Sequence, residues 1–142
     1  YLSAILDLYD RRIVTFKISD HNDNPLVMNT FDEAVHLEPD AHPLFHSDRG
    51  FQYTSAQFYT RLKEHHMKQS MSRVAHCIDN GPMEGFWGIL KREMYYHQHF
   101  NNRSMLVTAI TDYIRYYNNQ RLQRKLNVMT PMEYHNQYIN VA

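Results

Sequence analysis

The chain has 142 residues, a length suited to one domain that buries a real hydrophobic core. Apolar residues make up 43% and aromatic residues 13%, which is ordinary for a globular fold, and no apolar run approaches the ~18 to 20 residues of a membrane span. Basic and acidic side chains balance at 15 each, so the net charge gives no support for nucleic-acid binding. The single cysteine, Cys77, excludes an internal disulfide and favours a reducing cytoplasm.

The charges are distributed unevenly along the chain. Residues 1–40 carry three basic and eight acidic side chains, whereas residues 91–125 carry seven basic and two acidic ones. A polyanion would therefore prefer the second segment. Surface charges also cluster on solvated helix faces, so this pattern alone does not favour nucleic-acid binding.

The chain opens with a predicted hairpin and a helix. Two short apolar runs, residues 2–8 and 12–18, flank a turn at residues 9–11 and predict adjacent antiparallel strands. Pro25 then begins a segment with apolar residues at helix spacing, and this helix is expected to cover the sheet. Because Tyr1 is not a methionine and adjoins a predicted strand, we expect a domain truncated at its N-terminus.

A short strand, a turn, a helix and another strand are predicted next. Residues 44–46 lie between two prolines and predict a strand, and the turn Asp48-Arg49-Gly50 follows it at once. Ser55 suits the N-cap of a helix that includes residues 58–66. Residues 68–71 predict a short edge strand.

Helices dominate the remainder of the chain. After a predicted loop at residues 72–80, Pro82 fits the first turn of a helix whose apolar residues recur at i, i+3, i+4 and i+7. A second helix is predicted to begin at Ser104 and to end at residues 118–119, and Thr130 suits the N-cap of a last short helix. Strands interrupted by helices and then helices alone indicate an α/β domain with a mixed sheet covered on both faces.

Asp48, Glu84 and Lys91 stand out by their positions and spacing. Asp48 follows a predicted strand, and Glu84 lies in the first turn of a helix with thirty-five residues between the two. Lys91 comes about two turns later on roughly the same face. Two Mg²⁺ ions ~3.5 to 4 Å apart can catalyse phosphodiester transfer, and carboxylate oxygens suit that ion. Taken singly, each carboxylate is a common turn or first-turn residue, so neither one alone favours a metal site.

The residues around these positions resemble a known family. The matching stretches are residues 46–55, 70–73, 79–91, 116–121 and 130–134. They resemble insertion-sequence transposases of the DDE transposase and integrase superfamily, which is related to the retroviral integrases. The likeness runs through nearly the whole chain.

The resemblance implies both a fold and a function. The expected fold is a ribonuclease H-like α/β domain over residues 1–142, a mixed sheet flanked by helices with its first strand missing. The expected function is metal-dependent cleavage and transfer of DNA strands during transposition, with element ends and target duplex as partners and a homodimer or higher oligomer as the assembly. The implied catalytic ligands of Mg²⁺ or Mn²⁺ are Asp48 and Glu84, and the implied DNA contacts are Lys91, Asn80, Arg73 and Arg121.

The first aspartate of the family pattern is not expected within this chain. The resembled proteins carry it on the strand before the hairpin, so Asp7 is not expected to be catalytic and should instead be partly buried and paired with Arg11 or Arg12. A two-metal site is expected only when that first aspartate is present. Residues 1–142 alone should therefore bind metal weakly and cut DNA poorly.

Other functions remain open at this stage. The chain could be a catalytically inactive remnant of a mobile element that only binds nucleic acid or a protein. It could also be another nuclease with the same fold, but the sequence Tyr117-Asn118-Asn119 disfavours that alternative. Ten histidines suggest zinc, but they lack cysteine partners at finger spacing. Five tyrosines could stack on unpaired DNA ends, although their spacing favours a place in the core: Tyr95, Tyr96, Tyr113, Tyr116 and Tyr117.

Overall fold

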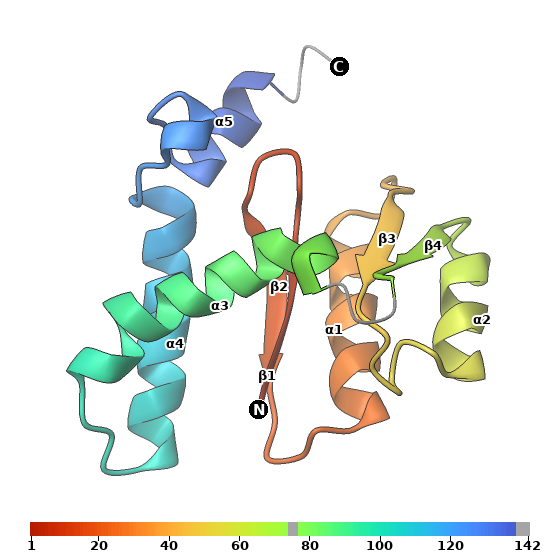
Figure 1. Ribbon diagram of the computed structural model, residues 1–142, viewed down its shortest axis with the longest axis horizontal. Helices are drawn as coiled ribbons and strands as arrows, with labels where there is room; N and C mark the ends of the chain where they lie inside the picture. The colour runs from red at the N-terminus through yellow and green to blue at the C-terminus, as the bar shows by residue number, and fades with distance from the viewer. Residues whose placement is uncertain (74–76, 139–142) are drawn as a thin grey trace. The chain divides into compact units, whose positions relative to one another are not determined.

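The structure is a computed structural model that describes residues 1–73 and 77–138. The backbone divides into two compact units. Unit 1 holds the described residues of Tyr1–Ile5 and Thr15–Glu84, and unit 2 holds Leu6–Val14 and the described residues from Gly85 onwards. The N-terminal hairpin thus contributes its open end to unit 1 and its tip to unit 2 (Figure 1).

The predicted hairpin is confirmed. Strands β1 (Leu2–Leu6) and β2 (Ile13–Ile18) pair with each other and are slightly shorter than the apolar runs that predicted them. At the open end, the amino group of Tyr1 donates to the carbonyl of Ser19 at 2.7 Å, and the N–H of Ser19 donates back to the Tyr1 carbonyl at 3.0 Å. Such reciprocal bonds are the mark of an antiparallel pair.

The helix predicted at Pro25 is α1 (Asn24–Leu37). Its N-cap is Asp23, whose carboxylate accepts a hydrogen bond from the N–H of Leu26 at 3.1 Å, and Pro25 occupies the first turn. Lys17 of β2 donates to Glu33 of α1 at 2.9 Å. The buried residues of α1 are Leu26, Val27, Met28, Thr30 and Phe31.

Three further elements complete most of unit 1: β3 (Leu44–Ser47), α2 (Ala56–Glu64) and β4 (Lys68–Met71). Ser55 caps α2 as predicted, since its hydroxyl accepts from the N–H of Phe58 at 3.2 Å. The helix ends at Glu64, two residues earlier than expected, because His66 has a φ of 56° that an α-helix does not accommodate.

An aromatic core holds these elements together. Phe31 of α1, Phe45 of β3 and Phe58 of α2 pack edge to face, with ring centroids 5.2 to 5.8 Å apart. Phe58 is completely buried, and Leu62 packs in the same cluster. The strand that leads to Asp48 is therefore fixed by dense packing.

The strands of unit 1 run in mixed directions. β3 and β4 pair in parallel, with Leu44 opposite Lys68 and Ser47 opposite Met71. Figure 1 shows these two strands side by side. Within the described residues the hairpin and the β3–β4 pair form two separate two-stranded sheets rather than one continuous sheet.

Unit 2 is largely helical. Helices α3 (Gly81–Glu93), α4 (Arg103–Asn119) and α5 (Pro131–Tyr138) are joined by short 3-10 turns, η2 (Tyr95–His97) and η3 (Arg124–Leu126). Helix α3 begins in unit 1 and continues into unit 2. The buried apolar residues of unit 2 include Phe86, Leu90, Met94, Ile110, Tyr113, Ile114, Tyr117 and Leu126.

The predicted ends of these helices are close to those observed. Helix α4 begins one residue before Ser104 and ends at Asn119 as expected. Thr130 caps α5 as predicted: its hydroxyl accepts from the N–H of Glu133 at 3.2 Å, and the Glu133 carboxylate accepts from the N–H of Thr130 at 2.8 Å.

The loop predicted at residues 72–80 falls partly outside the described residues. Within the described part, Cys77–Asn80 forms a 3-10 turn, η1, that leads directly into α3. This turn was not expected.

Burial of the tyrosines follows the core expectation only in part. Tyr113 and Tyr117 of α4 are buried, as expected. The expectation is wrong for Tyr95, Tyr96 and Tyr116, whose side chains are exposed, because Tyr95 and Tyr96 lie in η2 beyond the end of α3 and Tyr116 lies on the outer side of α4.

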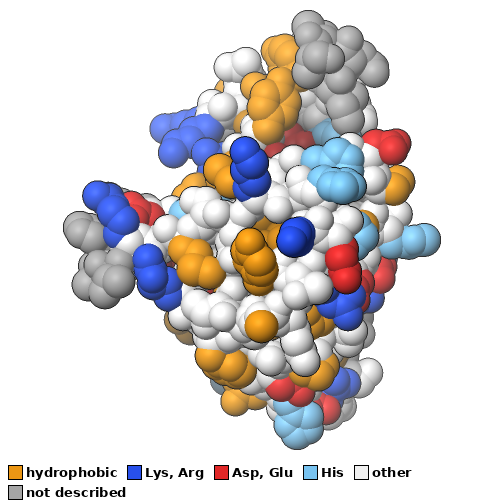
Figure 2. Space-filling view, turned by 90° about the vertical axis from the view of Figure 1, so that its right-hand side faces the viewer, with side chains coloured by type: hydrophobic (Ala, Val, Ile, Leu, Met, Phe, Trp, Pro, Cys, Tyr) orange, Lys and Arg blue, Asp and Glu red, His pale blue; other side chains and the backbone are white. Residues whose placement is uncertain are grey.

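The surface agrees with the balanced composition. The face shown in Figure 2 carries basic, acidic and histidine side chains interspersed with apolar ones, and no single sign of charge dominates it. In the part of the chain that the structure describes, no helix is both long and apolar enough to cross a membrane.

Candidate active site at the ends of two parallel strands

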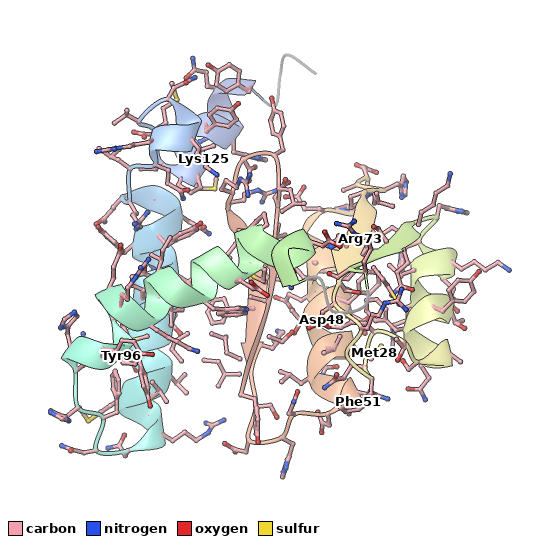
Figure 3. All side chains as sticks on the ribbon, in the orientation of Figure 1. Met28, Asp48, Phe51, Arg73, Tyr96 and Lys125 are labelled. Carbon is pink, nitrogen blue, oxygen red and sulfur yellow. The ribbon has the colours of Figure 1, made fainter. Side chains whose placement is uncertain are left out.

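Asp48 lies at the end of a strand, where the sequence placed it. It directly follows buried Ser47, the last residue of β3, and is itself exposed (Figure 3). One oxygen of its carboxylate accepts from the N–H of Gly50 at 2.8 Å. A Cβ atom at position 50 would lie 3.0 Å from that oxygen, so a glycine here leaves room for the carboxylate.

The segments after β3 and β4 are bonded to each other. The N–H of Ser72 donates to the carbonyl of Ser47 at 2.9 Å, which continues the parallel pairing beyond the strand ends. The guanidinium of Arg49 donates to the carbonyl of Ser72 at 2.9 Å. The turn that carries Asp48 is therefore fastened to the chain that leaves β4.

A further ion pair fastens the beginning of α3 to the end of β4. The carboxylate of Asp79, in η1, accepts from the backbone N–H of Arg73 at 3.0 Å and from its guanidinium at 2.9 and 3.0 Å. The hydrogen bonds that the Arg73 guanidinium donates to Asp79, together with the negative charge of Asp79, raise the pKa of Arg73. Glu84 follows five residues after Asp79, exposed and in the first turn of α3.

These contacts connect the two predicted metal ligands within unit 1. Arg49, the neighbour of Asp48, is hydrogen-bonded to Ser72. Arg73, the neighbour of Ser72, forms an ion pair with Asp79, which precedes the first turn of α3 and Glu84 in unit 1. Both carboxylates are exposed and could reach a cation from solvent. Among the described side chains no three His, Cys, Asp or Glu residues form a group able to hold a metal ion.

Tyr53 adjoins Asp48 and was not identified from the sequence. Burial raises the pKa of its phenol, the negative charge of Asp48 raises it further, and a hydrogen bond with Ser3 of β1 acts in the opposite direction. A Cβ atom at position 50 would lie 3.0 Å from the Asp48 carboxylate and 3.5 Å from a ring carbon of Tyr53, so the two side chains are near each other. Tyr53 therefore borders the candidate site and links it to β1.

The predicted DNA contacts fall in both units. Arg73 and half-buried Asn80 belong to unit 1, and exposed Lys91 lies in the last turn of α3 in unit 2. Arg121 has a structural partner: its guanidinium bonds both oxygens of Glu93, the shortest contact being 2.6 Å. No signal in the sequence pointed to that pair.

The expected partial burial of Asp7, at the hairpin tip, is confirmed. Asp7 is half-buried, and its carboxylate accepts from the N–H of Tyr9 at 2.7 Å. The ion pair described for Arg12 is with Asp10 at 3.1 Å, and buried Asp10 also lies 2.6 Å from the ring nitrogen of His135 on α5. The hairpin tip is thus bonded to α5 within unit 2.

Two family matches cover most of the chain. Residues 1–77 match a profile described as an integrase core domain, and residues 84–139 match a second profile with the same description. The chain belongs to the integrase core domain family. The resemblance that the sequence motifs indicated is confirmed.

Relatives of known sequence are transposases or transposase-like. The chain is 44% identical over 138 residues to the putative transposase InsK for insertion sequence element IS150 of Escherichia coli, covering 96% of this chain and 49% of that protein. It is 36% identical over 140 residues to an uncharacterized transposase-like protein of Haemophilus influenzae, covering 99% of this chain and 65% of that protein. The chain therefore spans about half to two thirds of the length of these relatives.

A solved structure shows the same fold. The catalytic core domain of HTLV-2 integrase, in complex with magnesium and in a trimeric form, superposes with a TM-score of 0.70 at 18% identity, covering 92% of this chain and 80% of that one. Its dimeric form also gives a TM-score of 0.70. The mixed α/β integrase-core fold, which is ribonuclease H-like, is thereby confirmed.

Proposed function

We propose that this chain supplies catalytic carboxylates for a DNA transposase that cleaves and joins DNA strands with the help of divalent metal ions. The observation that carries the proposal is the pair of links from Arg49 to Ser72 and from Arg73 to Asp79. The first link holds the turn that contains Asp48, and the second holds the start of the helix that contains Glu84. Both links join these segments to the chain at the neighbouring ends of two parallel strands. Carboxyl ends of parallel strands are the usual location of ligand sites in α/β folds.

The donor chemistry of the two residues fits Mg²⁺ or Mn²⁺. Both offer exposed carboxylate oxygens, which are the ligands that these ions prefer. When bound, such ions activate the attacking oxygen and stabilise the leaving oxygen in phosphodiester transfer. The chain's own contribution is position: the N–H of Gly50 orients Asp48, and helix α3 holds Glu84.

We also propose that a third carboxylate and a further strand come from a segment outside residues 1–142. In the described residues each sheet has two strands, and the family that the sequence resembles carries its first aspartate on a strand before the hairpin. On this proposal the chain by itself binds metal weakly and cuts DNA poorly. Robust strand transfer by residues 1–142 alone would contradict it.

The proposed partners are the DNA duplexes at the element ends and at the target. Lys91, Asn80, Arg73 and Arg121 are proposed to contact this DNA, with Arg121 sharing its charge with Glu93. The solved relative occurs in dimeric and trimeric forms, which supports a homodimer or higher oligomer for this chain. The cytoplasmic location expected from the lone cysteine stays a prediction.

The proposal is tested by titrating the chain with Mn²⁺ in a calorimeter. We expect weak binding that is lost in Asp48→Asn and equally in Glu84→Gln, whereas Glu64→Gln, which removes an exposed carboxylate of α2, leaves it unchanged. Nicking of a supercoiled plasmid in Mn²⁺ should fall to background in the same two variants. If all variants bind Mn²⁺ like the parent chain, the catalytic proposal fails and the inactive remnant is favoured.

A further inference from the structure

Two exposed tyrosines follow the last turn of α3. Tyr95 and Tyr96 have 47% and 67% of their surface accessible to solvent, although large aromatic side chains are usually buried. Figure 3 shows Tyr96 just beyond the end of α3. The catalytic proposal gives these rings no role.

The rings form a small ordered cluster. Tyr95 stacks on Phe100 with a centroid distance of 5.8 Å and an angle of 24° between the rings, and the Tyr96 ring meets Tyr95 edge to face at 5.9 Å. The segment is anchored at both ends: Met94 is 3% exposed, and the side chain of Asn102 caps α4. A ligand that stacks on these rings would have little ordering entropy to overcome.

Two basic side chains precede the rings along the chain. Lys91 and Arg92 are exposed in the last turn of α3, immediately before the cluster. Glu93, the next residue in the sequence, accepts hydrogen bonds from Arg121 and from the hydroxyl of Tyr113, at 2.6 and 2.9 Å. Exposed aromatic rings near exposed basic side chains suit a ligand with flat rings and phosphates.

We propose that this tyrosine cluster, Tyr95, Tyr96 and Phe100 with Lys91 and Arg92, binds unpaired nucleotides of single-stranded DNA. In the interior of a duplex both faces of each base are covered by its neighbours, so an exposed phenol ring stacks more readily on a base that is unpaired. The cations hold the adjacent phosphates without regard to sequence. The surface needs neither Asp48 nor Glu84 and acts without a metal ion.

The test is fluorescence anisotropy with a labelled oligothymidylate of about 12 nucleotides, in EDTA. Tyr96→Ala should weaken binding about fivefold or more, since one base stacked on one ring contributes at least that factor. Tyr96→Phe keeps the ring and should bind like the parent chain. The matched control is Tyr59→Ala, which removes a tyrosine of α2 that is 61% exposed and should leave the affinity unchanged.

A second variant tests the phosphate contacts. Arg92→Gln should reduce the slope of log affinity against log salt by about 0.7, the value for one phosphate contact on a single strand. A blunt duplex of the same length should lose less than about twofold in affinity with Tyr96→Ala, because its bases are already stacked. Circular dichroism and thermal melting of each variant establish that it is folded.

Three results would overturn the proposal. One is a parent chain that does not bind the oligonucleotide, and another is a Tyr96→Ala variant that loses single-stranded and duplex binding equally. The third is a Tyr96→Ala variant with unchanged DNA binding and a lower mass in sedimentation, which would identify the cluster as a contact between two copies of the chain. Because the buffer contains no divalent metal, these results do not depend on the carboxylate site.

Discussion

At the scale of single residues, the space around Asp48 is set by its neighbour Gly50. A Cβ atom at position 50 would lie 3.0 Å from the Asp48 carboxylate and 3.2 Å from the side-chain oxygen of Gln52, which is buried and bonded to Asn22. Because Gln52 has little freedom to move, the Asp48 carboxylate must give way. The backbone of Gly50 has no positive φ, so the backbone itself tolerates alanine.

Gly50→Ala should therefore weaken Mn²⁺ binding measured by calorimetry without a large loss of stability. We expect the free energy of unfolding in urea to change by about 1 kcal/mol or less, as for most substitutions outside a core. The matched control is Phe51→Ala, because this adjacent side chain is 61% exposed and should change neither quantity. Unchanged Mn²⁺ affinity in Gly50→Ala would show that the position of the Asp48 carboxylate does not matter.

Glu93 gives a prediction about pH. Its pKa is lowered by the hydrogen bond from Arg121, burial acts against this, and Tyr113 adds a second hydrogen bond that lowers it. A carboxyl group with a lowered pKa stabilises the fold above its unfolded pKa of about 4.3, and this stability is lost as the pH falls through the folded pKa.

The parent chain should therefore lose more unfolding free energy than Glu93→Gln between about pH 6 and about pH 3. Since the Glu93 side chain is 36% exposed, we expect a difference of about 1 kcal/mol or less. Urea denaturation across that pH range measures it, with Glu64→Gln as the control. Parallel pH profiles for Glu93→Gln and the parent chain would rule out a stabilising role for the pair.

At the scale of the elements, Asn118 joins the end of α4 to the hairpin. Its side-chain oxygen accepts from the N–H of Ile13 at 2.8 Å, and its side-chain nitrogen donates to the carbonyl of the same residue at 2.9 Å. Ile13 is only 3% exposed, so water cannot readily replace either bond. One amide thus satisfies both backbone groups at the beginning of β2.

Asn118→Leu should leave both Ile13 backbone groups unsatisfied and lower the free energy of unfolding by about 2 kcal/mol or more. Neighbouring Asn119 is exposed, and its amide donates to the carbonyl of Arg115 within the same helix. Asn119→Leu is therefore the matched control, with an expected change within about 0.5 kcal/mol. Equal effects in urea denaturation would mean that the bonds to Ile13 do not stabilise the fold.

The elements differ in how far the sequence predicts them. The caps at Ser55 and Thr130 were predictable because each bond reaches only three residues along the chain. The bond between Asn118 and Ile13 spans 105 residues, and no local pattern encodes such a pair. The same holds for Asp10 and His135, which are 125 residues apart.

At the scale of the whole molecule, the candidate site depends on hydrogen bonds and an ion pair between segments that are separate in the sequence. The spacing of Asp48 and Glu84, together with the family resemblance, predicted that both would serve one site, and this stays a prediction. The ion pair between Arg73 and Asp79 was not predicted from the sequence. Parallel pairing of β3 and β4 also required the three-dimensional structure.

Arg73→Ala tests whether the ion pair between Arg73 and Asp79 positions the start of α3. Removing a positive charge near a cation site should by itself strengthen Mn²⁺ binding, but the loss of the bonds to Asp79 should release the start of α3. We expect the second effect to dominate and the affinity to fall by up to about fivefold, the range for a partly exposed ion pair. Calorimetry measures it, with Arg115→Ala as the control for an exposed arginine. A gain in affinity would mean that Arg73 acts only through its charge.

The central claim is that Asp48 and Glu84 hold a divalent cation together. A crystal of the chain soaked in Mn²⁺ tests it most directly, because the anomalous signal locates the ion independently of the protein density. The claim predicts an anomalous peak in contact with carboxylate oxygens of both Asp48 and Glu84. A peak on one carboxylate alone, or two carboxylates too far apart to share an ion, would contradict it.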